Sequence, residues 1–354
     1  MQANVKFSSR RFFLSLMLSS CAVILLQNYN IAEDTSFTFN SICIFAGLAI
    51  SALFFIPSII IKKNTDSDFL KLSQSYTPKA KIPLAVFYSL YFIYVAEFFL
   101  LPYTDMFHTK YYSDVSPCII SFILLACCVY AAYKGANVIS RFGIFLFLFA
   151  LLTNILIMGG SITSLDFKHY GFEIKGGANE LLQNIIYFAT PSFIAVIFAC
   201  LSSYTKNFKV RQPFVSLLIT GVKYSLVTFF IWFALGDYAS RQDYQTFMLS
   251  RVAHFSTFGG IESFYLALAT MSVFMIISLL LCCITKSLGS NGDLKNIIIF
   301  TAIIFALYVT AVFNNSIQEL LLNPFIFILL TFIAAVVIPT VYIFVWRKSN
   351  ARKA

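Results

Sequence analysis

Charged side chains are scarce in this sequence. Asp, Glu, Lys and Arg make up only 11% of the 354 residues, whereas an average soluble domain carries about 25%. So few charges cannot cover the surface of a soluble globule of this length. Because 59% of the residues are hydrophobic, the composition excludes a cytoplasmic enzyme, a secreted disulfide scaffold and a disordered chain. It indicates a membrane protein.

Histidine is rare as well, and the residues needed for metal or nucleophilic chemistry are not grouped. The chain has three histidines, and all of them fall outside or at the edge of the long apolar runs. The eight cysteines lie in or beside these runs, and the adjacent pairs at 127–128 and 282–283 lack zinc-site spacing. No nucleophile has a base beside it in a recognisable motif. We therefore expect no metal, no cofactor and no enzymatic activity.

Long apolar runs dominate the chain. A helix needs roughly 20 mostly apolar residues to cross a membrane, and the runs have this length without the polar alternation of a barrel strand. The first is not followed by a signal-peptide cleavage motif, so we expect it to be retained. The predicted transmembrane helices are 11–27, 40–61, 83–102, 117–133, 142–160, 181–203, 213–236, 262–285, 296–313 and 321–346.

The basic residues between these helices predict the orientation. With a cytoplasmic N-terminus, 19 Lys and Arg residues lie on the cytoplasmic side and 5 on the other. Lys286 is counted in this cytoplasmic set, and Asp68 is one of the few acids on the same side. The bias predicts that both termini are cytoplasmic. It also explains the net charge of +10 without nucleic-acid binding.

Three ionisable residues lie within or at the edge of the predicted helices, where each is a functional candidate by default. Glu97 either reaches the headgroups or has a vestibule or proton-linked role. Lys223, near the middle of its helix, either tethers the structure or faces a wet cavity. Glu262 either caps the N-terminus of the eighth helix or takes part in coupling or gating.

Two of the helices carry signs of a break near mid-membrane. Small polar residues cluster at 19–21 in the first, and Pro191 lies in the middle of the sixth. A proline removes a backbone donor and either kinks or unwinds a helix. Unwound backbone at this depth survives where it is buried in protein or lines a cavity. Breaks in corresponding helices of two repeats, here about 11–160 and 181–346, are typical of a transporter binding site.

Four stretches of the sequence form a recognisable set: Ser9–Phe13; Lys134–Arg141; Leu235-Gly236-Asp237 with Phe247, Ser250 and Arg251; and Ile261–Phe264. In their order and spacing they resemble one known family, the GerAB-type permeases of the amino acid–polyamine–organocation superfamily, which form the B subunits of bacterial spore germinant receptors. The resemblance extends over essentially the whole chain, which differs from the family in having Gly260 before Ile261-Glu262 and in lacking Gly-x-Glu in the sixth helix.

This resemblance implies an all-α, LeuT-like 5+5 inverted repeat with interrupted helices one and six. The ligand site would lie beside the two breaks, flanked by the third and eighth helices, where half-helix ends can bind an amino acid's charged groups. The residues at these positions are Ser19, Ser20 and Cys21; Phe188, Ala189, Thr190 and Ser192; Tyr91 and Tyr94; and Tyr265 and Ser272.

The resemblance further implies a sensing role. The chain would bind a small nutrient, an amino acid in the simplest case, and trigger germination through a receptor A subunit and a C-subunit lipoprotein in the spore inner membrane. The alternatives are a proton-coupled amino acid transporter in the bacterial cell membrane and a scaffold subunit whose cavity is vestigial.

Overall fold

The computed structural model describes residues 6–26, 36–65, 68–76, 80–167, 176–254, 261–289 and 292–351. Within these ranges, ten helical segments are long and apolar enough to cross a membrane, as predicted. The first five are Ser9–Leu26 (α1), Phe37–Thr65 (α2), Lys81–Lys110 (α4), Pro117–Lys134 (α5) and Ala136–Ser161 with a 3-10 extension to Ser164 (α6).

The second five include two composite segments. The sixth consists of Ala178–Phe188 (α7), a 3-10 turn Thr190–Ser192, Phe193–Leu201 (α8) and a final turn Ser202–Tyr204. The tenth consists of Pro324–Phe332 (α14), a π-helical stretch Ile333–Val337 and Ile338–Ala351 (α15). The others are Arg211–Leu235 (α9), Glu262–Ser287 (α11) and Leu294–Phe313 (α12).

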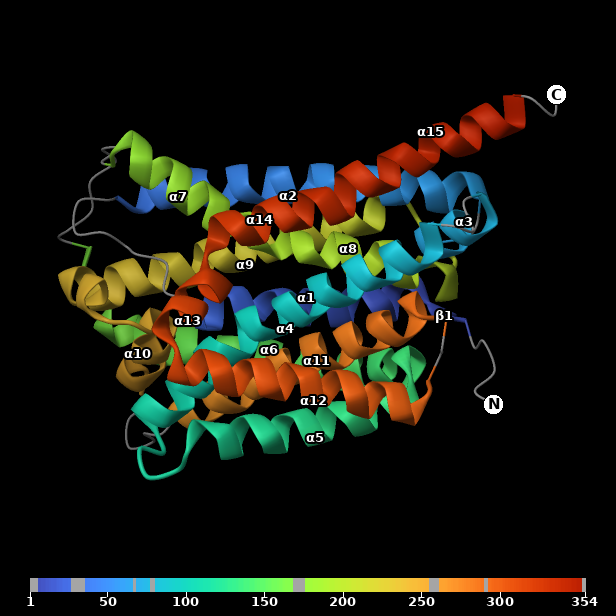
Figure 1. Cartoon of the computed structure of the whole chain (residues 1–354). Coiled ribbons are helices and arrows are strands. Elements are labelled where there is room, and N and C mark those ends of the chain that lie inside the picture. Colours follow the sequence, from blue (N-terminus) through green and yellow to red (C-terminus); the bar gives the residue numbers. More distant parts are fainter. Residues whose placement is uncertain are drawn as a thin grey trace.

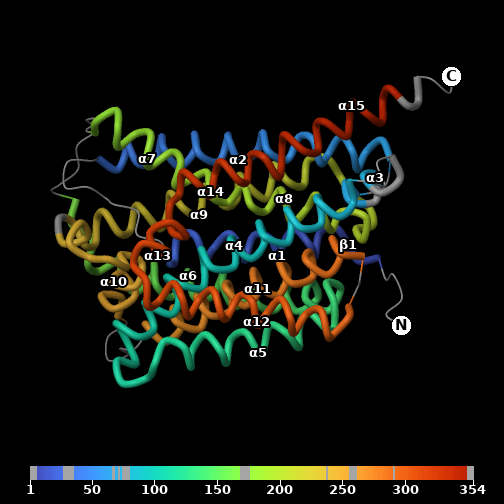
Figure 2. The backbone as a smooth tube through the Cα atoms, in the orientation of Figure 1, coloured from blue at the N-terminus to red at the C-terminus, as the bar shows by residue number. Residues whose placement is uncertain are grey.

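Short elements connect these segments at the two ends of the bundle (Figure 1). Both termini lie at one end, which we call the basic end, where α1 begins and α15 finishes; the backbone tube in Figure 2 follows the same path. Phe69–Tyr76 (α3) and the parallel pair Phe7–Ser8 (β1) and Thr205–Lys206 (β2) lie there. At the opposite end lie Gly236–Arg241, a 3-10 helix, Gln245–Val252 (α10) and Asn315–Leu322 (α13).

Burial separates central from peripheral helices. In α1, α4, the sixth segment and α11, between 72% and 89% of the most apolar window is buried within the protein. In α5, α6 and α12 the figure is 28%, and exposed side chains such as Phe145 and Ile155 suit contact with lipid. The site should therefore be sought around the four central segments.

The sixth helix is broken as predicted, but the first is not. An interrupted first helix was expected at Ser19, Ser20 and Cys21, and this expectation is wrong because α1 is continuous from Ser9 to Leu26. The three side chains donate back to carbonyls three or four residues earlier, Ser19 to Ser15 O and Ser20 and Cys21 to Met17 O. These bonds satisfy the polar groups inside the helix, so the cluster needs no break.

Candidate ligand-binding site

A cavity of about 340 Å³ lies between the centre of the bundle and the opposite end. Its volume is at the lower limit of the range typical of small-molecule sites. Four separate parts of the chain besides α4 enclose it: the end of α1, the end of α7, the loop before α10, and α13 with the start of α14. The lining residues are Leu26, Phe98, Leu101, Pro102, Asp105, Tyr187, Tyr244, Gln318, Leu322 and Pro324.

Asp105 is the only acidic or basic residue among the described residues that line the cavity. Its carboxylate accepts a hydrogen bond from the Tyr244 hydroxyl at 2.5 Å, and this hydroxyl also lies 3.2 Å from the Pro102 carbonyl. Burial and the Asp105 carboxylate raise the pKa of Tyr244 above its usual value, so the phenol stays neutral. Lys110 lies 5.9 Å from the Tyr244 ring centroid. The mouth therefore offers a negative charge beside apolar walls, with a lysine close by.

The break in the sixth segment follows shortly after Tyr187, which lines the cavity. Pro191 has no N–H to donate, and the carbonyls around it find side-chain partners instead. Thr190 Oγ1 donates to Tyr187 O at 2.8 Å, and Ser51 Oγ of α2 donates to Ala189 O at 3.0 Å. Ser192 Oγ is buried and has no hydrogen-bond partner among the described residues.

Gly47 of α2 makes the break possible at this place. A Cβ at this position would lie 2.6 Å from the Phe188 carbonyl carbon and 2.8 Å from the Ala189 backbone nitrogen. Real Cβ atoms do not approach backbone so closely, so only glycine lets α2 pack against the turn. The close packing also brings Ser51 within reach of Ala189.

Hydroxyl groups from four other elements hold the second half of α1 beside the cavity. Tyr187 donates to Val23 O at 3.0 Å and Thr246 of α10 donates to Ile24 O at 2.8 Å. Tyr224 of α9 and Tyr265 of α11 donate in the same way, to Ser20 O and Leu25 O. Carbonyls near the end of a helix need such partners when water is excluded. Sequence reasoning assigned Tyr265 to the ligand and missed the other three donors.

None of the predicted ligand-binding residues lines this cavity. The structure brings the α1 and sixth-helix sets together in a buried layer beneath it, where α1 contacts the turn at Thr190–Ser192. Tyr91 and Tyr94 turn toward the tenth segment, with their hydroxyls 3.1 Å from Thr331 Oγ1 and 3.3 Å from Asn323 O. Ser272 donates to Leu268 O within its own helix. A ligand role for these residues stays a prediction.

The three ionisable candidates have different surroundings. Glu97 is fully buried, so the interpretation that it reaches the headgroups is wrong. Both its carboxyl oxygens, and the Nζ of Lys223 in α9, are buried without a hydrogen-bond partner among the described residues. Glu262 opens α11 and forms an exposed ion pair with Arg251, with Oε2 3.3 Å from Nε. A role for each in coupling or gating stays a prediction.

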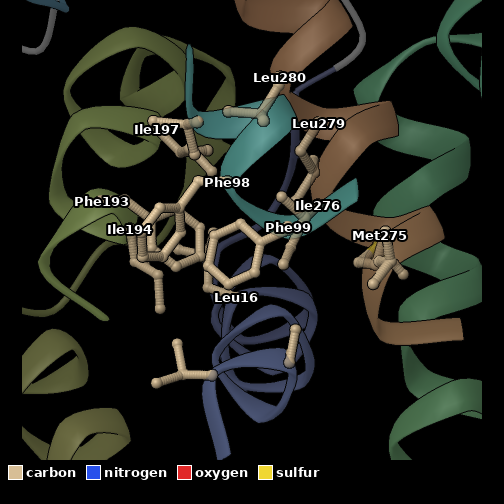
Figure 3. Close-up of a cluster of buried hydrophobic side chains, with 14 of the residues drawn as sticks. Leu16, Phe98, Phe99, Phe193, Ile194, Ile197, Met275, Ile276, Leu279 and Leu280 are labelled. Atoms are coloured by element: carbon tan, nitrogen blue, oxygen red, sulfur yellow. The ribbon is translucent and has the colours of Figure 1, made fainter. Parts of the chain in front are cut away.

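A dense apolar layer is buried between α1, α4, the sixth segment and α11 (Figure 3). Phe98 lines the cavity and belongs to this layer, in which the ring centroids of Phe99 and Phe193 are 5.1 Å apart. Leu16 of α1 and Met275 of α11 also belong to the layer. The labelled side chains of the layer are all apolar, so they offer no hydrogen-bonding group to a polar solute.

Below this layer, a buried ion pair closes the basic end. Lys286, counted from the sequence as a loop charge, lies within α11 and pairs with Asp68, which directly precedes α3. Asp68 is fully buried and Lys286 nearly so. The ammonium also donates to Cys200 O at 2.6 Å and Ser203 Oγ at 2.8 Å. The pair thus joins α11, α3 and the end of the sixth segment.

The comparisons with known proteins agree with this architecture. Residues 12–320 match a family described as "Spore germination protein". One similar solved structure is a Na+-coupled sialic acid symporter in a substrate-bound outward-open state, with 12% identity, a TM-score of 0.64, and coverage of 94% of this chain and 79% of that one. Another is MhsT in complex with L-phenylalanine, with 14% identity, a TM-score of 0.62, and coverage of 96% and 88%. No curated protein matches the chain in sequence.

These structural matches confirm the predicted LeuT-like fold of ten helices. Within the described residues, no three His, Cys, Asp or Glu side chains form a group that could hold a metal ion. What the arrangement offers instead is a small cavity with one carboxylate among its described lining residues, next to the end of α7. Such a site can bind a compact solute with an ammonium group and an apolar part.

Proposed function

Because the chain belongs to the spore germination protein family, we propose that it is the nutrient-binding B subunit of a germinant receptor. One observation carries the proposal. The cavity is lined by Asp105 and by Tyr187 at the end of α7, and the turn that breaks the sixth segment just after α7 contains Ser192, whose Oγ has no partner among the described residues. Family membership supplies the context of spore germination, and the cavity supplies the binding role.

The chemistry of the cavity favours a small amino acid or amine as the ligand. Asp105 would accept the ammonium group, and Gln318 and Lys110 lie near enough to the mouth to meet a carboxylate. Phe98 and Leu101 would pack against the side chain. From this position the ligand could move down to the predicted layer around Ser20, Thr190 and Ser192, once the side chains of that layer separate.

Binding of matched ligands by the purified protein tests this assignment. We would titrate the 20 common L-amino acids, and then the N-acetylated form of any that binds, because acetylation removes the ammonium charge. Asp105→Asn should weaken binding by about 10-fold to 100-fold, the loss typical of a hydrogen bond to a charged group. Asp114→Asn is the control, because Asp114 is exposed at the same end and does not line the cavity.

If the N-acetylated compound binds as well as the free amino acid, Asp105 does not recognise an ammonium group. Thr190→Tyr provides a separate check on the deeper layer, because it places a bulkier side chain in the turn that contains Ser192. We expect it to shift or abolish the nutrient response while the protein still reaches the membrane. An unchanged dose–response curve would remove the sixth-helix site from the proposal.

Signalling rather than uptake defines the receptor role. We propose that the basic end faces the cytoplasm, as the charge bias predicts, and that the chain lies in the spore inner membrane with an A subunit and a C-subunit lipoprotein. Affinity purification from spores should recover both partners. Labelled ligand should not enter proteoliposomes above the level of protein-free vesicles.

Proton-coupled amino acid transport is the second candidate, and Glu97 favours it. An ionisable residue inside a membrane-spanning helix is a candidate proton carrier by default, and both carboxyl oxygens of Glu97 lack a hydrogen-bond partner among the described residues. Uptake driven by a pH gradient, lost in Glu97→Gln, would support transport. Absence of such uptake from proteoliposomes that still bind the ligand would leave the receptor role.

A further inference from the structure

A second cavity, of about 460 Å³, lies at the basic end, and its walls are rich in lysine. Four of its lining residues are lysines, and among the described residues that line it none is acidic. The pairing of β1 with β2 brings these residues together, because it places the start of the chain against the segment that follows the sixth helix. The lining residues are Lys6, Lys62, Lys63, Thr205, Lys206, Asn207, Phe208 and Val210.

Backbone dipoles add to the positive charge of this lysine pocket. Val210 lines it and is also the N-cap residue of α9, so the N-terminus of a 25-residue helix adjoins the pocket. A helix N-terminus carries about half a positive charge and free N–H groups, which favour a phosphate-type anion. Lys62 and Lys63 lie in the last turn of α2, where they also offset the partial negative charge of that C-terminus.

A sharp turn of the backbone at Asn207 forms part of the pocket. Asn207 has φ of 58°, a left-handed conformation that turns the chain sharply between β2 and α9. Asparagine adopts this conformation more readily than most residues. Lys206 before the turn and Val210 after it both line the pocket, and Lys62, which is buried, lines it as well.

An exposed apolar face leads from the pocket along α9. Val210, at the rim of the pocket, is 44% exposed. Phe214, Leu218 and Val222 follow at intervals of four residues and are exposed as well, so all four share one face of the helix. An anion with a long apolar part could occupy the pocket and this face together.

We propose that the lysine pocket binds the phosphate headgroup of an acidic phospholipid, with an acyl chain along the apolar face of α9. The pocket lies at the end of membrane-spanning helices, at the level where headgroups are found. Basic pockets between helices on the cytoplasmic side are typical sites for such headgroups. A bound lipid would hold residues 205–210, which follow in the chain directly after Ser203 and Tyr204, two residues that contact the Lys286–Asp68 pair.

Native mass spectrometry of the purified full-length protein tests the proposal. The protein would be titrated with palmitoyl-oleoyl phosphatidylglycerol and, in parallel, with the phosphatidylcholine of the same chains. We expect at least a five-fold preference for phosphatidylglycerol. The double variant Lys63→Gln/Lys206→Gln should lose about 25-fold in affinity, because each lysine near a membrane surface contributes about five-fold.

The matched control is Lys295→Gln/Lys348→Gln, which removes two exposed lysines from the same end but from outside the pocket; it should keep the preference. Equal binding of the two lipids by the wild-type protein would overturn the proposal, even if the variant does not fold. Full competition by 10 mM inorganic phosphate would show that the pocket takes a free anion, and this too would overturn the lipid assignment. So would displacement of the lipid by an acidic peptide at micromolar concentration.

Discussion

Replacement of Asp68 by Asn removes the negative partner from the buried ion pair at the basic end. In the wild-type protein Asp68 is fully buried, and Lys286 is 7% exposed. The Lys286 ammonium lies 3.9 Å from the Tyr204 ring centroid and keeps two neutral acceptors, Cys200 O and Ser203 Oγ. The substitution therefore leaves a positive charge in a buried place without its counter-ion.

The expected loss of stability follows from this geometry. Breaking a buried ion pair by removing one partner costs about 3–5 kcal/mol, and the two remaining acceptors place Asp68→Asn near the lower value. The entropy of unfolding at the midpoint is about 2.1 cal/mol/K per residue, or about 0.74 kcal/mol/K for this chain. A loss of about 3 kcal/mol therefore lowers the Tm by about 4 °C.

Thermal unfolding in detergent, followed by intrinsic fluorescence, measures this change. The double variant Asp68→Asn/Lys286→Met should be less destabilised than the sum of its single variants, because it removes the unpaired charge as well. Glu262→Gln is the control, since it breaks the exposed pair with Arg251 and should cost about 1 kcal/mol or less. If Asp68→Asn costs no more than Glu262→Gln, or if the single effects simply add, the buried pair does not hold this end together.

Two further predictions concern the other end of the bundle and the break. Gly47→Ala should destabilise the protein by about 1–3 kcal/mol, the usual cost of overpacking, because the new Cβ meets backbone at 2.6 Å. In the control Gly177→Ala the nearest atom is 3.9 Å away, so this variant should lower the Tm by less, the change at the N-cap of α7 being its main cost. Equal shifts in Tm would contradict the close packing at Gly47. The pKa of Tyr244 is raised in the folded protein, so the stability that its neutral phenol contributes is present below pH 10 and is lost as the pH rises above it. Between pH 10 and 11.5 the Tm of the wild-type protein should therefore fall more steeply than the Tm of Tyr244→Phe. Parallel curves of Tm against pH for the two proteins would refute the role of burial and Asp105.

The ten membrane-spanning segments could be predicted because the bilayer imposes a length and a composition on each one separately. The break at Pro191 was equally predictable, since a missing N–H is a property of the residue itself. By contrast, the polar cluster at 19–21 gave a false sign of a break. Serine can bond within its own helix or to a partner elsewhere, and the sequence does not distinguish these outcomes.

The cavity and the closure of the basic end depended on contacts between distant parts of the chain. Asp105 and Tyr244 are separated by 139 positions, and Lys286 becomes a buried residue only because Asp68, 218 positions earlier, reaches it. The π-helical stretch in the tenth segment also involves a contact between distant parts of the chain: the Tyr88 hydroxyl on α4 donates to Ala334 O within it at 2.7 Å.

The low charge content and the apolar runs thus determined, without any structure, that this protein crosses the membrane ten times and that few polar groups remain inside. Each of those conclusions depends only on the composition of one segment and on the lipid or water around it. Tertiary structure alone decided which of the remaining polar groups face a cavity and which form hydrogen bonds with other helices. The reason is that a hydroxyl or a carboxylate in lipid needs a hydrogen-bond partner, and that partner is close in space but distant in the sequence.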